Sequence, residues 1–201
     1  MMNLSDFVIV KDRVFTDEFC DELVSLFETH PDYTHEGHSG QGLNDDIKKT
    51  TDLNLFYHEE LMEQYGYQIF DGFNKVVEEL LLSLPFQNKF TPISQVFTQD
   101  TEYTTCQLQK YDKGTGHYNA YHFETDSYET TPRLFVFILY LNDVEIGGET
   151  ELMYENMKVQ PKKGRVLCHP ATYPFVHNGH TPISDDKYIL TTWLAYVNDG
   201  E

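Results

Sequence analysis

The first part of the chain combines a short apolar run with helical spacing of apolar residues. The run Phe7-Val-Ile-Val10 is typical of a short strand. Thr16, which two acidic residues follow, is a typical helix N-cap and predicts a helix that continues to Glu28. One face of this helix is apolar and consists of Phe19, Leu23, Leu26 and Phe27. The pattern therefore predicts an amphipathic helix that buries this face.

A longer helix is predicted over residues 57–84, with Gly66 as a point where it can break and Pro85 as its end. Its apolar positions recur at helical spacing: Leu61, Tyr65, Ile69, Phe73, Val76, Val77, Leu80 and Leu81. Residues 30–46, between the two helices, are rich in histidine and glycine and have no periodicity, which is typical of a mobile loop. The length and composition of 30–56 make it a candidate substrate lid.

The second half of the chain changes to the patterns of β-strands. Residues 104–111 alternate, and 134–141 form a nearly continuous apolar run rich in β-branched and aromatic residues. Further short strands are predicted over 118–124, 149–153, 157–160, 164–168, 174–178 and 187–197. Helices followed by many short strands indicate an α+β fold. We expect a double-stranded β-helix (jelly-roll, cupin-like) core with the N-terminal helices packed on its major sheet.

Length and composition limit the organisation and the partners. The 201 residues fit one domain over 1–201, with the first strand, helices and lid in 1–100 and the jelly-roll core in 101–201. A net charge of −19 disfavours nucleic acids and anionic membranes, and favours a basic or neutral partner. Three widely spaced cysteines and the lack of a leader or spanning segment predict a soluble protein of the reducing cytoplasm. The oligomeric state stays open.

The first chemical signal is the triplet His122-Phe123-Glu124. Residues two apart on a strand point to the same face, so the imidazole and the carboxylate can coordinate one metal ion. His177, 53 residues later in another β-rich segment, is the candidate third ligand. Two histidines and one carboxylate suit non-haem Fe(II) with open coordination positions. Zinc also accepts these ligands, so the three residue types alone leave the metal open.

A second signal is Lys187, ten residues after His177. On a neighbouring strand its ammonium could pair with the far carboxylate of a dicarboxylic co-substrate that chelates the metal. A zinc hydrolase has no such need. Tyr111 and Tyr140, each near the end of a predicted strand, could donate hydroxyl hydrogen bonds to the same carboxylate.

Several residues have competing interpretations. Asp126 is an alternative to Glu124 if the strand continues, although strand geometry places it further away. Arg133 could anchor a substrate or order the loop before the apolar strand, and Trp193 could pack in the core or form a pocket wall. The remaining histidines are interpreted as loop, rim or structural residues: His30, His35, His38, His117, His169 and His180.

Taken together, residues 106–193 resemble the catalytic core of the 2-oxoglutarate and Fe(II)-dependent dioxygenases of the prolyl 4-hydroxylase type. The elements that carry the resemblance occur in the family's order: Tyr111, Gly114-Thr-Gly116, His122-Phe-Glu124, Arg133, Tyr140-Leu-Asn142, Gly147-Gly-Glu-Thr150, Pro161-Lys-Lys-Gly164, His177, Lys187 and Trp193. The chain departs from the family at one ligand, because it has Glu124 where the usual pattern is His-x-Asp.

The resemblance implies a function and a set of cofactors. It implies Fe(II), 2-oxoglutarate and O2, with ascorbate as a reductant, and hydroxylation of a prolyl residue of a peptide or protein with release of succinate and CO2. It also implies that His122, Glu124 and His177 bind the metal, while Lys187, Tyr111 and Tyr140 bind the co-substrate. Two other classes stay open: a non-catalytic, cupin-like metal sensor or scaffold, and a zinc hydrolase.

Overall fold

The computed structural model describes residues 3–40, 42–84 and 100–197. Within them lie two α-helices, α1 (Asp17–Thr29) and α2 (Glu59–Ser83), and short 3-10 helices at Leu4–Phe7, Pro31–Tyr33 and Leu55–Tyr57. The strands are β1 (Ile9–Lys11), β2 (His35–Glu36), β3 (Lys48–Lys49), β4 (Thr51–Asn54), β5 (Thr101–Tyr103), β6 (Gln107–Tyr111), β7 (His117–His122), β8 (Arg133–Tyr140), β9 (Thr150–Leu152), β10 (Met157–Val159), β11 (Val166–Pro170), β12 (His177–Gly179) and β13 (Lys187–Tyr196).

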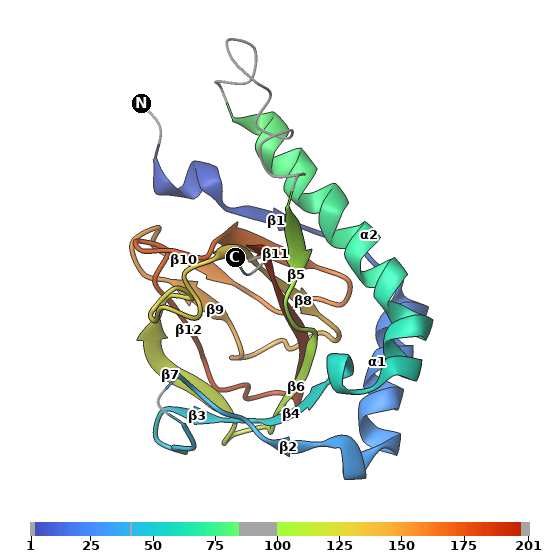
Figure 1. Ribbon diagram of the computed structural model, residues 1–201. Coiled ribbons are helices and arrows are strands. Elements are labelled where there is room, and N and C mark those ends of the chain that lie inside the picture. The colour runs from blue at the N-terminus through green and yellow to red at the C-terminus, as the bar shows by residue number, and fades with distance from the viewer. Residues whose placement is uncertain (1–2, 41, 85–99, 198–201) are drawn as a thin grey trace.

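The strands form two antiparallel sheets that face each other (Figure 1). The larger sheet has the order β1-β11-β8-β13-β6-β4-β2, and β5 pairs with the C-terminal residues of β13, beyond the part that pairs with β6. The smaller sheet has the order β10-β9-β12-β7-β3. Helices α1 and α2 cover the outer face of the larger sheet (Figure 1). The predicted double-stranded β-helix with helices on its major sheet is confirmed.

Strand β8 explains why an almost wholly apolar run forms the centre of the larger sheet. Phe135, Phe137 and Leu139 join the cluster that packs against the helices. Val136, Ile138 and Tyr140 alternate with them and point into the space between the sheets. Both faces of this strand are therefore buried. For this reason its sequence is continuously apolar and does not alternate between apolar and polar residues. The helices contribute the rest of this cluster through the apolar faces of α1 and α2, which the sequence predicted.

The N-terminal elements differ from the sequence predictions in detail. The first strand begins two residues later than predicted, because Leu4–Phe7 forms a 3-10 helix. Helix α2 runs unbroken through Gly66, so the suggested break is wrong. A different glycine of α2 matters for packing: a Cβ at Gly72 would come within 2.3 Å of the Phe15 ring. Pro85, the predicted end of the helix, lies outside the described residues.

The largest difference concerns residues 30–56, where a loop was predicted and the structure has three strands. Strand β3 pairs with β7 of the smaller sheet, and β4 pairs with β6 of the larger sheet. The segment therefore passes from one sheet to the other. Two charged residues of this segment, Lys48 and Asp52, form a buried ion pair. Lys48 Nζ lies 2.8 Å from Asp52 Oδ2, and the two residues are 4% and 0% exposed. That residues 30–56 act as a lid stays a prediction. That residues 1–201 form a single domain also stays a prediction.

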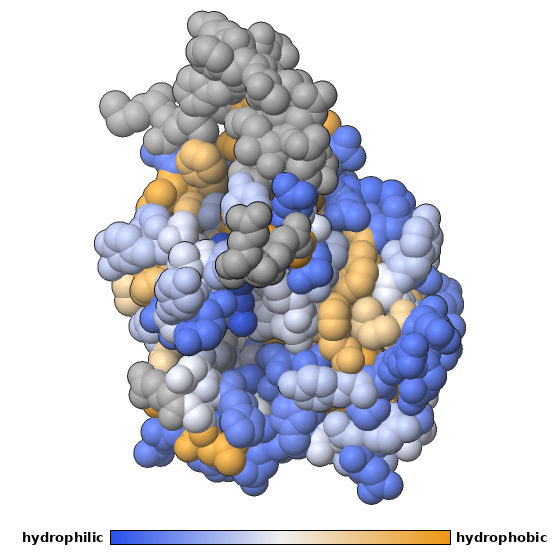
Figure 2. All heavy atoms as spheres, viewed as in Figure 1, coloured by the Kyte–Doolittle hydropathy of each residue, from blue (hydrophilic) through white to orange (hydrophobic). Residues whose placement is uncertain are grey.

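The surface is mostly polar on the face shown in Figure 2. Figure 2 shows a mainly hydrophilic face on which hydrophobic patches are separated by hydrophilic side chains. None of the helices within the described ranges is long and apolar enough to cross a bilayer.

Candidate metal centre

A cavity of about 680 Å³ opens between the two sheets. Its walls come from β4, β6 and β13 of the larger sheet and from β7 and β12 of the smaller one. Nearly all candidate site residues line it: Tyr111, His122, Glu124, Arg133, His177, Lys187 and Trp193. Segments far apart in the sequence thus meet in one cavity, as the sequence analysis expected for a single site.

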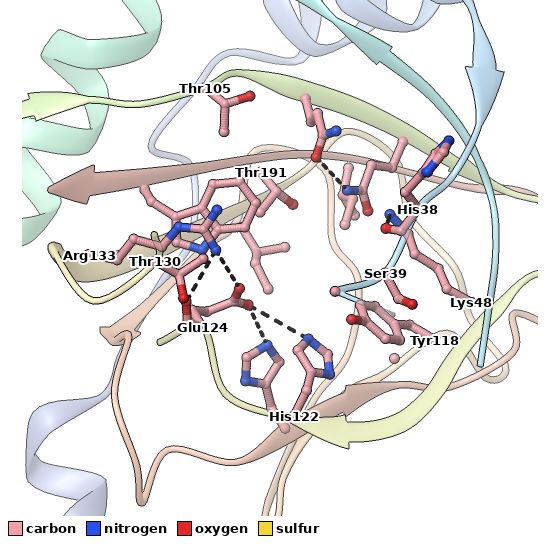
Figure 3. Close-up of a pocket in the computed structure, with 18 of the residues that line it drawn as sticks. His38, Ser39, Lys48, Thr105, Tyr118, His122, Glu124, Thr130, Arg133 and Thr191 are labelled. Carbon is pink, nitrogen blue, oxygen red and sulfur yellow. Dashed lines mark hydrogen bonds and ion pairs between the residues drawn. The ribbon is translucent and has the colours of Figure 1, made fainter. Parts of the chain in front are cut away.

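His122 and His177 lie directly opposite each other on neighbouring antiparallel strands, β7 and β12. Their ring centroids are 4.4 Å apart. Strand β7 ends at His122, so Glu124 lies just beyond it, yet its Oε1 is 3.7 Å from His122 Nε2 and 3.2 Å from His177 Nε2 (Figure 3). One potential ligand atom of each residue lies within 4.8 Å of the others. The three predicted residues therefore converge on one point.

The histidine tautomers show what this point can accept. His122 Nδ1 lies 2.9 Å from the carbonyl oxygen of Ala120, and His177 Nδ1 lies 3.2 Å from that of Phe175. A carbonyl oxygen only accepts hydrogen bonds, so both Nδ1 atoms carry a hydrogen, and each Nε2 faces Glu124 as the ring nitrogen available to a metal ion. A cation between the two Nε2 atoms and the carboxylate would be bound by all three side chains. The donor set therefore fits a divalent metal ion, and its orientation by backbone carbonyls is typical of metal-binding histidines.

The protonation states agree with ligation near neutral pH. Burial, reinforced by the nearby His177, lowers the pKa of His122 to about 4, so its ring is neutral. Burial opposes ionisation of Glu124, but the adjacent imidazoles of His177 and His122, together with the guanidinium of Arg133, outweigh it and lower the pKa of the carboxyl to about 2. Glu124 is thus a carboxylate at pH 7.

Lys187 lies in the same cavity, opposite Tyr111 in the pairing of β13 with β6. It is 1% exposed, its Nζ lies 3.8 Å from the centroid of the Tyr111 ring, and it donates a hydrogen bond to the carbonyl oxygen of Gly148 at 3.2 Å. Burial lowers its pKa to about 7, against the opposing effect of Glu149. Among the described residues it forms no ion pair, so it can pair with an incoming anion.

The two tyrosines differ in their access to the cavity. Tyr111 lines it, and its hydroxyl donates to Gln109 Oε1 at 3.1 Å. Tyr140 does not line it, because its hydroxyl donates at 2.7 Å to Thr150, whose side chain forms the wall instead. The structure therefore brings Tyr111 and Lys187 together and places Tyr140 behind Thr150.

Arg133 and Trp193 form another wall of the cavity. The guanidinium carbon of Arg133 lies 4.0 Å from the centroid of the Trp193 ring. Trp193 is 8% exposed and belongs to the inner apolar cluster, so both interpretations of this residue hold. Asp126 also lines the cavity, but it is exposed and lies outside the His–Glu–His group.

The other histidines are not members of the His–Glu–His group, although the His169 ring lies 4.9 Å from the His177 ring and His38 lines the cavity. The sequence analysis also missed several polar wall residues. His117 contacts the carbonyl oxygen of Asp45 at 2.8 Å, His180 contacts Glu151 at 2.6 Å, and His169 is buried against the carbonyl oxygen of Pro170. The missed wall residues are Lys48, Asn54, Gln109 and Asn178. Gln109 and Asn178 lie in predicted strands and their polarity was the only signal, whereas Lys48 and Asn54 lie in the segment that was interpreted as a loop.

The strands that carry this site lie in a part of the chain that is similar to known proteins. The model of the 2OG-Fe(II) oxygenase superfamily matches residues 106–195. Two Arabidopsis thaliana proteins are similar: probable prolyl 4-hydroxylase 9 is 29% identical over 46% of this chain and 39% of its own length, and prolyl 4-hydroxylase 13 is 28% identical over 43% and 38%. The family model covers the strands that carry the His–Glu–His group, and residues 106–195 are thus similar to the 2OG-Fe(II) oxygenase superfamily. The alignments span about two fifths of the length of these curated relatives.

Solved structures share the fold of this chain beyond the matched residues. The viral collagen prolyl hydroxylase of Paramecium Bursaria Chlorella virus-1 is 20% identical, with a TM-score of 0.66 over 95% of this chain and 97% of that one. A Trichoplax adhaerens prolyl hydroxylase, solved with a peptide fragment of hypoxia inducible factor, is 14% identical, with a TM-score of 0.68 over 96% and 84%. The resemblance to the prolyl 4-hydroxylase type, given on sequence motifs, is confirmed.

Proposed function

We propose that this chain is an Fe(II)- and 2-oxoglutarate-dependent dioxygenase that hydroxylates a prolyl residue of a peptide or protein. The observation that carries the proposal is the presence, in one cavity, of a His–Glu–His cluster and a buried lysine without an ion-pair partner among the described residues. A metal sensor or a zinc hydrolase needs the cluster but has no use for Lys187. The prolyl specificity is supported by the relatives named prolyl 4-hydroxylases.

The residues divide the work of such a reaction between two ends of the cavity. His122, Glu124 and His177 would hold Fe(II), because their lone pairs and carboxylate converge and their Nδ1 atoms are fixed by backbone carbonyls. When bound, Fe(II) with 2-oxoglutarate and O2 supplies the oxidising chemistry, with succinate and CO2 as by-products and ascorbate as an auxiliary reductant. The protein itself orients the reactants and excludes water.

At the other end, Lys187 would pair with the far carboxylate of 2-oxoglutarate. Its buried ammonium forms a charge-assisted hydrogen bond most strongly where water is excluded. Tyr111, opposite it in the sheet, offers a second hydroxyl donor once it turns from Gln109. The direct contact of Tyr140 with the co-substrate, implied by the family resemblance, is replaced in this proposal by Thr150, which lines the cavity.

The function is tested by anaerobic addition of Fe(II) and 2-oxoglutarate to the full chain. We expect a weak visible charge-transfer band that requires both components, and release of succinate after admission of O2. A peptide array with and without proline should then show which peptides increase succinate release. Binding of metal without the band or succinate would support a sensor or scaffold. Activity that follows co-purified zinc and does not require O2 would support a hydrolase.

The choice between Glu124 and Asp126 as the third ligand gives a second prediction. Replacing Glu124 by Ala should weaken Fe(II) binding by at least roughly 100-fold, more than the loss of an outer hydrogen-bond partner usually costs. Asp126→Ala should leave the dissociation constant nearly unchanged, because Asp126 lies outside the converging group. Anaerobic titration of both variants measures this. Normal Fe(II) binding by Glu124→Ala, with loss in Asp126→Ala, would reassign the ligand.

A further inference from the structure

Glu124 is the ligand position at which this chain differs from the His-x-Asp pattern, and its backbone is fixed on both sides. Its N–H donates to the carbonyl oxygen of Ala171 at 2.8 Å. Its own carbonyl oxygen accepts a hydrogen bond from Arg133 Nη1 at 3.2 Å. The residue is 9% exposed, so its carboxylate has little contact with water. The remaining freedom of Glu124 is in its side chain.

The two carboxylate oxygens of Glu124 have different partners. Oε1 faces the two histidines, at 3.2 Å from His177 Nε2 and 3.7 Å from His122 Nε2. Oε2 faces Arg133 Nη1 at 3.5 Å, and Figure 3 shows the guanidinium on the opposite side of the carboxylate from the imidazoles. The carboxylate thus spans the space between the metal-binding histidines and a cation.

Arg133 is itself held in place. It lies at the start of β8, paired with Ala195 of β13, and its guanidinium packs on the Trp193 ring at 4.0 Å. A planar guanidinium fixed on an aromatic ring is a rigid donor, whereas a lysine at this position would be a mobile point charge. Glutamate has one more rotatable bond than aspartate, so a rigid second partner removes freedom that an aspartate would not have.

We propose that Arg133 is a positioning residue for Glu124: it holds Oε2 so that Oε1 stays directed at His122 and His177, which allows a glutamate to serve where the family pattern has aspartate. The inference rests on the proposed function only in taking Glu124 as a metal ligand. It predicts coupling between the two residues, because Glu124 Oε2 is already 3.5 Å from Arg133 Nη1 and a side chain one methylene shorter should lose this contact when it binds a metal with the histidines.

The test measures binding of Co(II) alone, without co-substrate, to the anaerobic full chain by calorimetry and by its visible d–d spectrum. Arg133→Gln should weaken Co(II) binding by about 10- to 100-fold in the Glu124 background. In the Glu124→Asp background the same replacement should weaken Co(II) binding clearly less, since only the hydrogen bond from Arg133 to the main-chain carbonyl oxygen of residue 124 is then lost. The sign is diagnostic: removing a positive charge beside a metal ion would by electrostatics alone strengthen binding.

Matched variants separate this inference from other roles of Arg133. Arg133→Lys keeps the charge without the planar fork and should restore Co(II) binding only in part. Thermal unfolding of each metal-free variant controls for loss of fold, and Arg133→Met serves as a second replacement if Arg133→Gln unfolds. Unchanged or tighter Co(II) binding in Arg133→Gln, or equal losses in both backgrounds, would overturn the proposal. So would a higher KM for peptide with normal Co(II) binding, which would assign Arg133 to the substrate.

The outcome is independent of the dioxygenase assignment. If the Co(II) pattern holds but 2-oxoglutarate neither binds nor is turned over, Arg133 positions a metal ligand in a protein of another function. If 2-oxoglutarate is turned over but the Co(II) pattern fails, the proposed function stands without this inference.

Discussion

Replacing Lys187 by Met should weaken 2-oxoglutarate binding to the metal-loaded chain by roughly 30- to 5,000-fold, because removal of one partner of a buried charge pair costs about 2–5 kcal/mol. The methionine side chain fills a similar volume, so the wall beside Tyr111 should stay packed. Calorimetric titration of 2-oxoglutarate into the Mn(II)-loaded protein measures the effect. An unchanged dissociation constant would remove Lys187 from the co-substrate site.

The same residue should make 2-oxoglutarate binding depend on pH. Burial lowers the pKa of Lys187 to about 7, so in the ligand-free protein its ammonium is charged below pH 7 and mostly neutral above it. The far carboxylate needs the charged form, so binding above pH 7 must take up a proton. The dissociation constant should be flat below pH 7 and rise by up to about tenfold per pH unit above it.

Lys187→Arg is the matched control for this dependence. A guanidinium stays charged throughout the accessible range, so the rise of the dissociation constant above pH 7 should disappear, even if the larger side chain weakens binding overall. A slope in Lys187→Arg equal to that of the natural chain would assign the pH dependence to another group.

Replacing Asp52 by Ala should reduce the free energy of unfolding by about 3–5 kcal/mol, because it leaves the Lys48 ammonium buried without its partner. For a chain of this size the midpoint of thermal unfolding should fall by roughly 6–20 °C. The loss should be large because Asp52 also accepts a hydrogen bond from Thr50 at 2.7 Å. Thermal or urea unfolding of the metal-free protein measures it.

The control removes both charges. A double variant with Lys48→Met and Asp52→Leu should be more stable than Asp52→Ala alone, because apolar side chains of similar volume avoid the desolvation of two charges. A loss of less than about 1 kcal/mol in Asp52→Ala would mean that water reaches the pair, as at an exposed salt bridge.

The sequence could predict those parts of the fold that local patterning encodes. The helix stripes of α1 and α2 and the apolar run of β8 are each contiguous signals, and each forms the predicted type of element. Strands β3 and β4 gave no such signal, because Lys48 and Asp52 are buried by pairing with each other and not by apolar character. Their strand partners lie more than fifty residues away, so only tertiary structure identifies them as strands.

The candidate site shows the same division. The spacing of His122 and Glu124 could be recognised locally, and the motif order led to His177 and Lys187. The sequence could not show which of these side chains reach the cavity and which are buried behind its wall. Tyr140 points between the sheets, as its position in the strand predicts. Its hydroxyl nevertheless donates a hydrogen bond to Thr150, and only the three-dimensional packing shows this. Lys48 and Asn178 escaped notice because polarity alone does not distinguish a cavity wall from a surface.

The direct opposition of His122 and His177 has a consequence for how this chain can change in length. Deleting or inserting one residue within β7 would turn His122 to the other face of the sheet, because side chains alternate along a strand. The segment from 125 to 132 connects Glu124 to β8 without entering either sheet, so it can vary in length at far lower cost. Insertions and deletions in sequences related to this chain should therefore occur in residues 125–132 and should be rare within β7 and β12.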